Sequence, residues 1–180
     1  MKIYTHPKEG IIRMKEQGIY TSEDALISIL STVDTPLSES IKSSYKYVLE
    51  LRFDDLPFNI SFEEENNKES DFYGMTSFNY SHYARIYKFV KGTLKDFDGC
   101  LRIHCTAGIS RSGAVAVGVS LLKEDKEVYE QVIKDNNIIP NQLVLSYFIQ
   151  GVTNSNTYFF DVQDMYNRLS YKTLDIKDIV

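Results

Sequence analysis

The residue types that could do chemistry in this chain are concentrated in one short run. Cys105 and Arg111 are separated by five residues, and small side chains dominate the run around them. The full run reads His104-Cys105-Thr106-Ala107-Gly108-Ile109-Ser110-Arg111-Ser112-Gly113. The apolar residues 99–103 before it predict a short buried strand, and the small residues 114–119 after it predict a helix packed closely on a sheet. The sequence therefore predicts a loop between a strand and a helix, with a thiol at its base.

Such a loop has the properties of an anion site with a built-in nucleophile. Backbone N–H groups at the start of a helix converge on an anion, and a helix N-terminus beside an arginine favours the thiolate form of a cysteine. Cys105 could then attack without a separate general base. Arg111 offers a planar fork that matches two phosphate oxygens, which the point charge of lysine does not.

Two neighbouring residues complete this prediction. Gly108 gives the loop a backbone conformation closed to other residues and is expected to keep Cβ atoms away from the anion. Ser112 can hydrogen-bond the sulfur and ease its later departure. A single cysteine is usually a small buried hydrophobe, so it is the joint occurrence of these residues at a strand-to-helix junction that indicates catalysis.

The motif His-Cys-x5-Arg-Ser resembles that of the cysteine-dependent protein tyrosine phosphatase superfamily. The form His-Cys-x-Ala-Gly-x-Ser-Arg-Ser is most similar to its dual-specificity branch, including small bacterial and phage members. The resemblance implies Cys105 as nucleophile, Arg111 as phosphate ligand and Ser112 as the group that assists hydrolysis of a phosphocysteine intermediate. His104 is implied to order the loop, with a buried core histidine as the alternative. The implied phosphate cradle consists of the backbone amides of Thr106, Ala107, Gly108, Ile109, Ser110 and Arg111.

Phosphoryl transfer also needs an acid to protonate the leaving oxygen. In the dual-specificity branch the acid follows a strand, and here the strand predicted over 47–53 runs directly into Asp54 and Asp55. The resemblance implies Asp55 as the acid, with Asp54 as the alternative, although adjacent acidic residues after a strand also form ordinary turns. The separation from Cys105 is longer than in minimal family members. The excess, residues 58–75, predicts a flap or insert near the site.

The class of substrate that we expect follows from residues that the chain lacks. The chain contains no tryptophan, so it cannot carry the Trp-Pro-Asp acid loop of the large tyrosine-specific phosphatases, and the resemblance implies a shallower, more permissive site. We expect a protein phosphatase that hydrolyses phosphotyrosine, with phosphoserine and phosphothreonine as further substrates. The alternatives are a non-catalytic phosphoprotein-binding module on the same fold and a phosphatase of a small-molecule or nucleotide phosphate.

The elements around the motif predict an α/β fold in a single domain over residues 1–180, with a central, largely parallel, twisted sheet flanked by helices. Strands are predicted over 2–4, 25–30, 47–53 and 99–103, and residues 34–36 predict a turn. Helices are predicted over 7–17, 80–94, the residues after the motif, 126–134, 141–150 and 160–169. Pro140 precedes Asn141, which we expect to cap the helix that follows, with an approach to the catalytic loop as the alternative.

Composition limits the other function classes. The chain has 180 residues, 43% hydrophobic and 25% charged, which is typical of one globular domain. Its net charge of −5, without a basic patch interleaved with aromatic residues, argues against nucleic acid as a partner. Neither a membrane-spanning run nor a secretory segment is visible, and two cysteines form no disulfide framework. We therefore expect a cytoplasmic protein. The expected partner is a phosphorylated protein, as the resemblance implies. We expect neither a metal nor another cofactor, because the three histidines are scattered singly along the chain.

Overall fold

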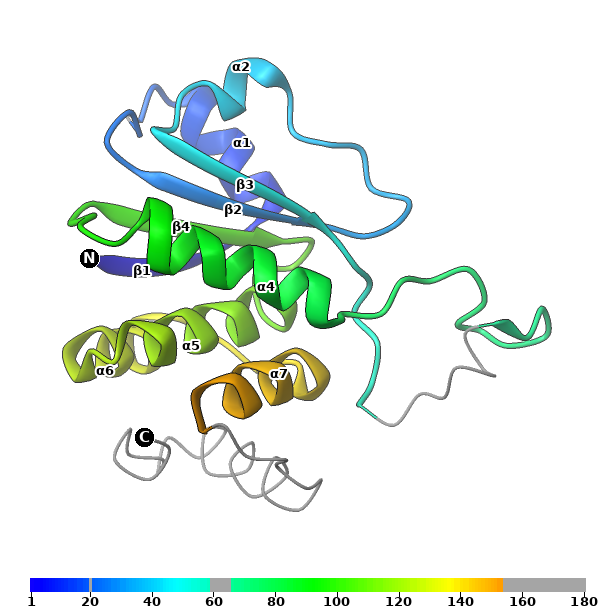
Figure 1. Cartoon of the computed structure of the whole chain (residues 1–180). Coiled ribbons are helices and arrows are strands. Elements are labelled where there is room, and N and C mark those ends of the chain that lie inside the picture. Colours follow the sequence, from blue (N-terminus) through cyan, green and yellow to red (C-terminus); the bar gives the residue numbers. More distant parts are fainter. Residues whose placement is uncertain (20, 59–65, 154–180) are drawn as a thin grey trace.

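The computed structural model describes residues 1–19, 21–58 and 66–153, and at the centre of this part lies a four-stranded sheet in the order β1-β4-β2-β3 (Figure 1). The strands are β1 (Lys2–Pro7), β2 (Ala25–Leu30), β3 (Tyr47–Arg52) and β4 (Cys100–Cys105). All three neighbouring pairs are parallel, which confirms the predicted α/β class and the largely parallel sheet. The carboxyl ends of the strands therefore meet at one edge, where the motif loop follows β4.

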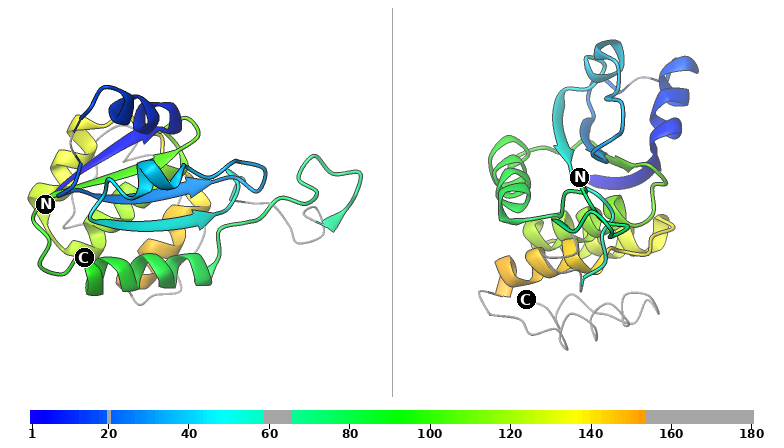
Figure 2. Two further views of the ribbon diagram at one scale, coloured as in Figure 1. Left: turned by 90° about the horizontal axis from the view of Figure 1, so that it is seen from above. Right: turned by 90° about the vertical axis from the view of Figure 1, so that its right-hand side faces the viewer.

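Helices cover both faces of this sheet (Figures 1 and 2). They are α1 (Lys8–Glu16), α2 (Glu39–Lys42), α4 (Tyr80–Lys88), the π-helical turn η1 (Phe89–Thr93), α5 (Arg111–Lys123), α6 (Lys126–Asp135) and α7 (Gln142–Thr153). A small core cluster joins α1 and α2 to β2, and a larger one joins the remaining helices to the opposite face. Across the described residues, none of the helices combines the length and the apolar character needed to cross a membrane.

Helix α5 is buried along nearly its whole length because it lies between the sheet and the outer helices. At Gly118 a Cβ atom would stand only 2.3 Å from the ring of Phe148 on α7. Glycine is thus required for α7 to pack this closely. The close packing fixes the axis of α5, whose first residue is Arg111, and so fixes the end of the motif loop.

Three elements differ from the sequence prediction. β1 extends to Pro7 instead of ending at residue 4, because its parallel register with β4 continues until Pro7 lies opposite Cys105. The helix predicted over 80–94 changes to a π-helical turn after Lys88, where the Leu94 amide donates to the Phe89 carbonyl at 2.9 Å. The short helix α2 was not predicted. The helix predicted over 160–169 lies outside the described residues.

The segment between β3 and α4 is closed at its base by Asp54 and Thr76. The Asp54 amide donates to the Thr76 carbonyl at 2.7 Å, and the Thr76 amide donates to Asp54 Oδ2 at 2.8 Å. Residues 66–75 extend outward from the body of the protein (Figure 2). Residues 59–65 lie outside the described part, so the flap predicted over 58–75 stays a prediction.

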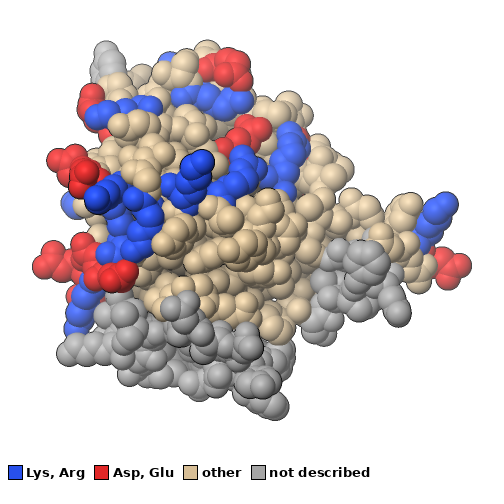
Figure 3. Space-filling view, viewed as in Figure 1, with Lys and Arg blue, Asp and Glu red and all other residues tan. Residues whose placement is uncertain are grey.

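Charged side chains fasten α4 and η1 to their neighbours. Figure 3 shows Lys and Arg side chains gathered along the border between α4 and the sheet edge. Arg85 Nη2 donates to the carbonyl of Glu50 on β3 at 2.7 Å, and Lys91 Nζ pairs with Glu124 at 2.9 Å. The Arg85 contact holds the helix that follows the insert against the strand that precedes it, and the Lys91 ion pair joins η1 to the end of α5.

Candidate active site

Cys105 ends β4 and is the floor of the motif loop. Its side chain is 2% exposed. The sulfur lies 3.2 Å from the Ser112 hydroxyl and accepts a hydrogen bond from the Gly108 amide, also at 3.2 Å. The loop between β4 and α5 therefore closes around the thiol, with a hydroxyl and an amide directed at it.

Gly108 is required here for two reasons that the structure shows. Its φ of +79° lies in the left-handed region that side chains with a Cβ disfavour. A Cβ atom at this position would also stand 2.4 Å from the His6 carbonyl carbon and from the Pro7 nitrogen. The backbone at the end of β1 therefore leaves no room for a Cβ atom at this position, which the sequence did not indicate.

Arg111 is buried, at 4% exposure, and its guanidinium is anchored from three directions. Nη1 donates to Ser31 Oγ and to the Phe53 carbonyl, both at 2.9 Å, and Nη2 donates to Thr106 Oγ1 at 2.8 Å. Nε is buried and has no hydrogen-bond partner within the described residues. An unsatisfied buried donor costs about 1–3 kcal/mol, so an acceptor bound beside it would stabilise this arrangement.

The loop after β2 supports Arg111 from behind. Thr106 Oγ1 accepts from Arg111 and donates to Asp34 Oδ2 at 3.4 Å, and the Ser31 amide donates to the same Asp34 oxygen at 2.8 Å. Arg52 Nη1 in turn donates to the carbonyls of Ser31 and Asp34, each at 3.1 Å. The sequence indicated only a turn at 34–36, so the roles of Ser31, Asp34 and Arg52 in holding the cradle were missed.

Asp34 adds a negative charge to the loop that holds Arg111. Burial alone would raise its pKa. The Ser31 amide and hydroxyl, together with the charges of Lys8 and Arg111, outweigh burial and hold the pKa of Asp34 below its usual value. Its carboxylate is therefore ionised at neutral pH and partly balances the charge of Arg111.

His104 lies directly before the nucleophile in the sheet. It is fully buried, and its Nε2 lies 2.8 Å from the hydroxyl of Ser28, its partner in the parallel register with β2. Burial, with a smaller contribution from Lys8 and His6, lowers the pKa of His104 to about 4. The ring is therefore neutral at physiological pH, with Nε2 paired to Ser28, and the backbone of His104 continues β4 up to Cys105.

Asp54 and Asp55 are adjacent but have different surroundings. Asp54 is 9% exposed, and its carboxylate accepts hydrogen bonds from the Thr32 hydroxyl, from the Thr32 amide at 3.1 Å and from the Thr76 amide at 2.8 Å. Asp55 is exposed, and its Oδ1 accepts from Ser110 Oγ of the motif loop at 2.7 Å. Asp54 therefore holds the base of the insert, and Asp55 lies against the loop that contains the thiol.

Asn141 brings a second donor to Asp55. Its Nδ2 donates to Asp55 Oδ1 at 2.8 Å and to the Leu56 carbonyl at 2.9 Å, while its Oδ1 accepts from the Val144 amide at 3.0 Å. Helix capping and an approach to the catalytic loop were alternatives in the sequence. The side chain caps the helix and reaches Asp55, and the backbone amide of Asn141 donates to the Ser110 carbonyl of the motif loop at 3.2 Å.

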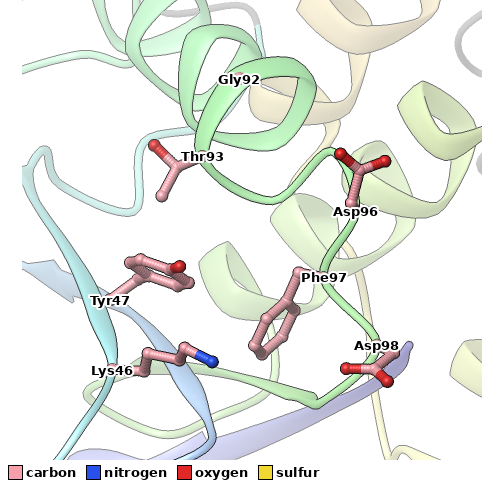
Figure 4. A pocket seen from close by; sticks show the side chains of 7 residues that line it. All are labelled: Lys46, Tyr47, Gly92, Thr93, Asp96, Phe97 and Asp98. Atoms are coloured by element: carbon pink, nitrogen blue, oxygen red, sulfur yellow. The ribbon is translucent and has the colours of Figure 1, made fainter.

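Two further features show what lies outside the candidate active site. In the described ranges, no group of three or more His, Cys, Asp or Glu side chains could hold a metal ion. A separate pocket of about 270 Å³ opens beside the starts of β3 and β4 (Figure 4). Tyr47 and Phe97, which line it, pack edge to face with their ring centroids 6.0 Å apart. Because the motif loop follows the opposite ends of the strands, this pocket does not belong to the candidate active site.

Comparisons with known proteins give a limited result. No family model and no curated protein matches this sequence. The chain is similar to a crystal structure of PTPMT1 in complex with PI(5)P, with a TM-score of 0.42 and 13% identity over 96% of this chain and 95% of that chain. It is also similar to Tk-PTP in the active form, with a TM-score of 0.39 and 15% identity over 94% and 90% of the two chains. At these values no role passes from those proteins to a residue of this chain.

Proposed function

We propose that this chain is a cysteine-dependent phosphatase of the dual-specificity type, which hydrolyses phosphotyrosine, phosphoserine and phosphothreonine in proteins through a phosphocysteine intermediate. One observation carries the proposal. A single loop holds the Cys105 sulfur 3.2 Å from a hydroxyl and an amide, and is closed by a buried arginine whose Nε has no partner in the described residues. A phosphate in this loop supplies the acceptor that Nε lacks.

In the first step the Cys105 thiolate attacks phosphorus, the S–P bond forms, and the bond between phosphorus and the ester oxygen breaks. The leaving oxygen takes a proton from Asp55. Ser110 and Asn141 hold Oδ1 of that carboxyl, which leaves Oδ2 to carry the proton. Arg111 and the loop amides bind the equatorial oxygens, on which negative charge is spread in the transition state.

In the second step water attacks the phosphocysteine and gives its proton to Asp55. The electrons of the S–P bond return to sulfur, and the Ser112 hydroxyl, 3.2 Å away, donates a hydrogen bond to the departing thiolate. Inorganic phosphate leaves, and both catalytic groups regain their starting protonation states. The cycle consumes one water and needs no other reactant.

The choice of a phosphoprotein as substrate rests on the family resemblance and on the uncharged loop. The loop side chains between Cys105 and Arg111 carry no lysine that would add cations for a polyanionic head group. We accordingly propose a cytoplasmic phosphoprotein phosphatase. A small-molecule phosphatase and a phosphoprotein-binding module remain the alternatives.

The assay that separates these functions uses the unaltered full chain. Turnover of p-nitrophenyl phosphate that survives EDTA and is lost on treatment with iodoacetate would support a cysteine phosphatase, and phosphate should protect against the inactivation. A phosphopeptide array probed with Cys105→Ser would then identify the preferred phosphoresidue. Phosphopeptide binding without any turnover by the unaltered chain would favour the binding module instead.

A further inference from the structure

An uncharged groove of about 420 Å³ opens beside the motif loop. Five of the residues that line it are apolar: Pro57, Phe58, Ile109, Ile139 and Pro140. The catalytic steps proposed above use none of these side chains. The groove therefore needs an explanation other than the bond-making chemistry.

The groove adjoins the motif loop. Ile109 and Ser110 line the groove and also lie between Cys105 and Arg111 in that loop. The far wall is fastened to the loop by two backbone hydrogen bonds, from Ile139 to the Ile109 carbonyl at 3.3 Å and from Asn141 to the Ser110 carbonyl at 3.2 Å. A phosphate bound in the cradle thus places the rest of its molecule next to this groove.

The lining selects for an apolar occupant. None of the lining residues is charged, so a nucleotide or a polyphosphorylated ring would find no cation there. Ile139 is 57% exposed, and covering it with an apolar group would gain roughly 25 cal/mol for each Å² removed from water. Gln142, the first residue of α7, adds a half-buried amide whose donor and acceptor match those of a peptide bond.

We propose that this groove is a substrate subsite that binds an apolar side chain flanking the phosphorylated residue of a protein substrate. The inference rests on the proposed function, because it needs the phosphate to be held in the motif loop. It also deepens that function, since it selects phosphoproteins with a hydrophobic neighbour over nucleotides and sugar phosphates.

The test compares phosphotyrosine peptides of equal length that differ only in having leucine or serine at one flanking position. Two positions before and two after the phosphotyrosine are varied in turn. At one or more positions we expect kcat/KM to be about tenfold higher for leucine, the discrimination typical of a hydrophobic pocket. In Ile139→Ser and in Ile139→Asp this ratio should fall toward one. Ile19→Ser is the matched control, because Ile19 is 44% exposed and lines a different pocket, and it should keep the ratio of the unaltered chain.

A ratio of rates cancels any general loss of activity in a variant. Equal kcat/KM for every leucine and serine pair would overturn the inference, and so would a leucine preference that survives in both Ile139 variants. Failure of the unaltered chain to turn over p-nitrophenyl phosphate would instead overturn the proposed function, and this inference with it.

Discussion

Asn141 donates its side-chain amide to the carboxylate of Asp55 at 2.8 Å, across 86 residues of sequence. The same side chain accepts from the Val144 amide at the start of α7. One residue therefore fixes the first turn of a helix and the orientation of the proposed acid. Because these two duties use different atoms, substitutions can separate them.

Asn141→Ser should keep the cap and lose the contact with Asp55, because serine caps helices about as well as asparagine but is too short to reach the carboxylate. Asn141→Ala should lose both. We expect kcat for an alkyl phosphate to fall about tenfold in each variant through misplacement of the acid, and the free energy of unfolding to fall by about 1 kcal/mol more in Asn141→Ala than in Asn141→Ser, because only alanine also loses the cap. Urea unfolding and steady-state kinetics measure the two effects. Unchanged kcat in Asn141→Ser would mean that Asn141 is a helix cap alone.

We predict different effects for substitutions of the two adjacent carboxylates, one on the rate and the other on the stability of the fold. Asp55→Asn should lower kcat by about 10²–10⁴ for poor leaving groups, with little effect on an activated aryl phosphate that departs without a proton. Asp54→Asn should instead destabilise the fold by about 1–3 kcal/mol, because it removes a charged acceptor from three partly buried hydrogen bonds.

The measurement is the slope of log kcat against leaving-group pKa for both variants, together with their urea midpoints. A steep slope in Asp54→Asn and a flat one in Asp55→Asn would move the acid by one residue.

The contrast between these residues shows what the sequence could and could not predict. Cys105, Arg111 and Ser112 lie within eight residues, so their spacing and a strand-to-helix junction were enough to predict that they share one loop. Ser31, which Arg111 contacts, is 80 residues away in the chain. Its role depends on a parallel sheet that brings the ends of β2 and β4 to one edge. No local pattern encodes that register.

The choice between Asp54 and Asp55 was open in the sequence for the same reason. Both follow the same strand, and the three donors to Asp54 come from segments distant in the chain, two from Thr32 after β2 and one from Thr76 where the chain returns. The π-helical turn after α4 was also beyond the pattern, because the apolar spacing of 80–94 continues through it and only the hydrogen bond from Leu94 to Phe89 reveals the change.

Gly108→Ala tests the loop conformation without touching a catalytic side chain. The added Cβ meets a φ of +79° and the backbone of His6 and Pro7 at 2.4 Å. The strain should cost about 1–3 kcal/mol and displace the amide that donates to Cys105. We expect vanadate binding and turnover to be lost together, while circular dichroism still reports an α/β fold. Gly92→Ala, where a Cβ would meet nothing within 4 Å, is the matched control, and a Gly108→Ala enzyme as active as that control would contradict the loop geometry.

The lowered pKa of the buried His104 should make the stability of the folded chain depend on pH. The pKa of His104 is lowered from 6.5 to about 4 in the folded chain, mainly by burial. Above pH 6.5 the ring is neutral in both states and the stability is fully present. As the pH falls from 6.5 toward 4, the unfolded chain takes up a proton that the folded chain does not, so stability is lost across that window.

Between about pH 7.5 and about pH 5.5 this linkage should remove roughly 1 kcal/mol of unfolding free energy. His6 adds to the loss, because burial and then Arg102 lower its pKa to about 4 as well. Urea midpoints across the range measure the slope, and His104→Asn should reduce it. An unchanged slope in that variant would show that His104 does not carry the titration.

Cys105→Ser separates binding from chemistry, because it removes the nucleophile and leaves the loop amides and Arg111 in place. Turnover of p-nitrophenyl phosphate should disappear, since a serine hydroxyl is not ionised at neutral pH and is a far weaker nucleophile than a thiolate, while inorganic phosphate should still bind and raise the thermal midpoint. Arg111→Lys is the complementary variant. A lysine cannot reproduce the contacts of the guanidinium with Ser31, Phe53 and Thr106, so phosphate should then bind weakly even though the thiol remains. Appreciable hydrolysis by Cys105→Ser would remove the thiol from the mechanism, whatever the phosphate binding showed.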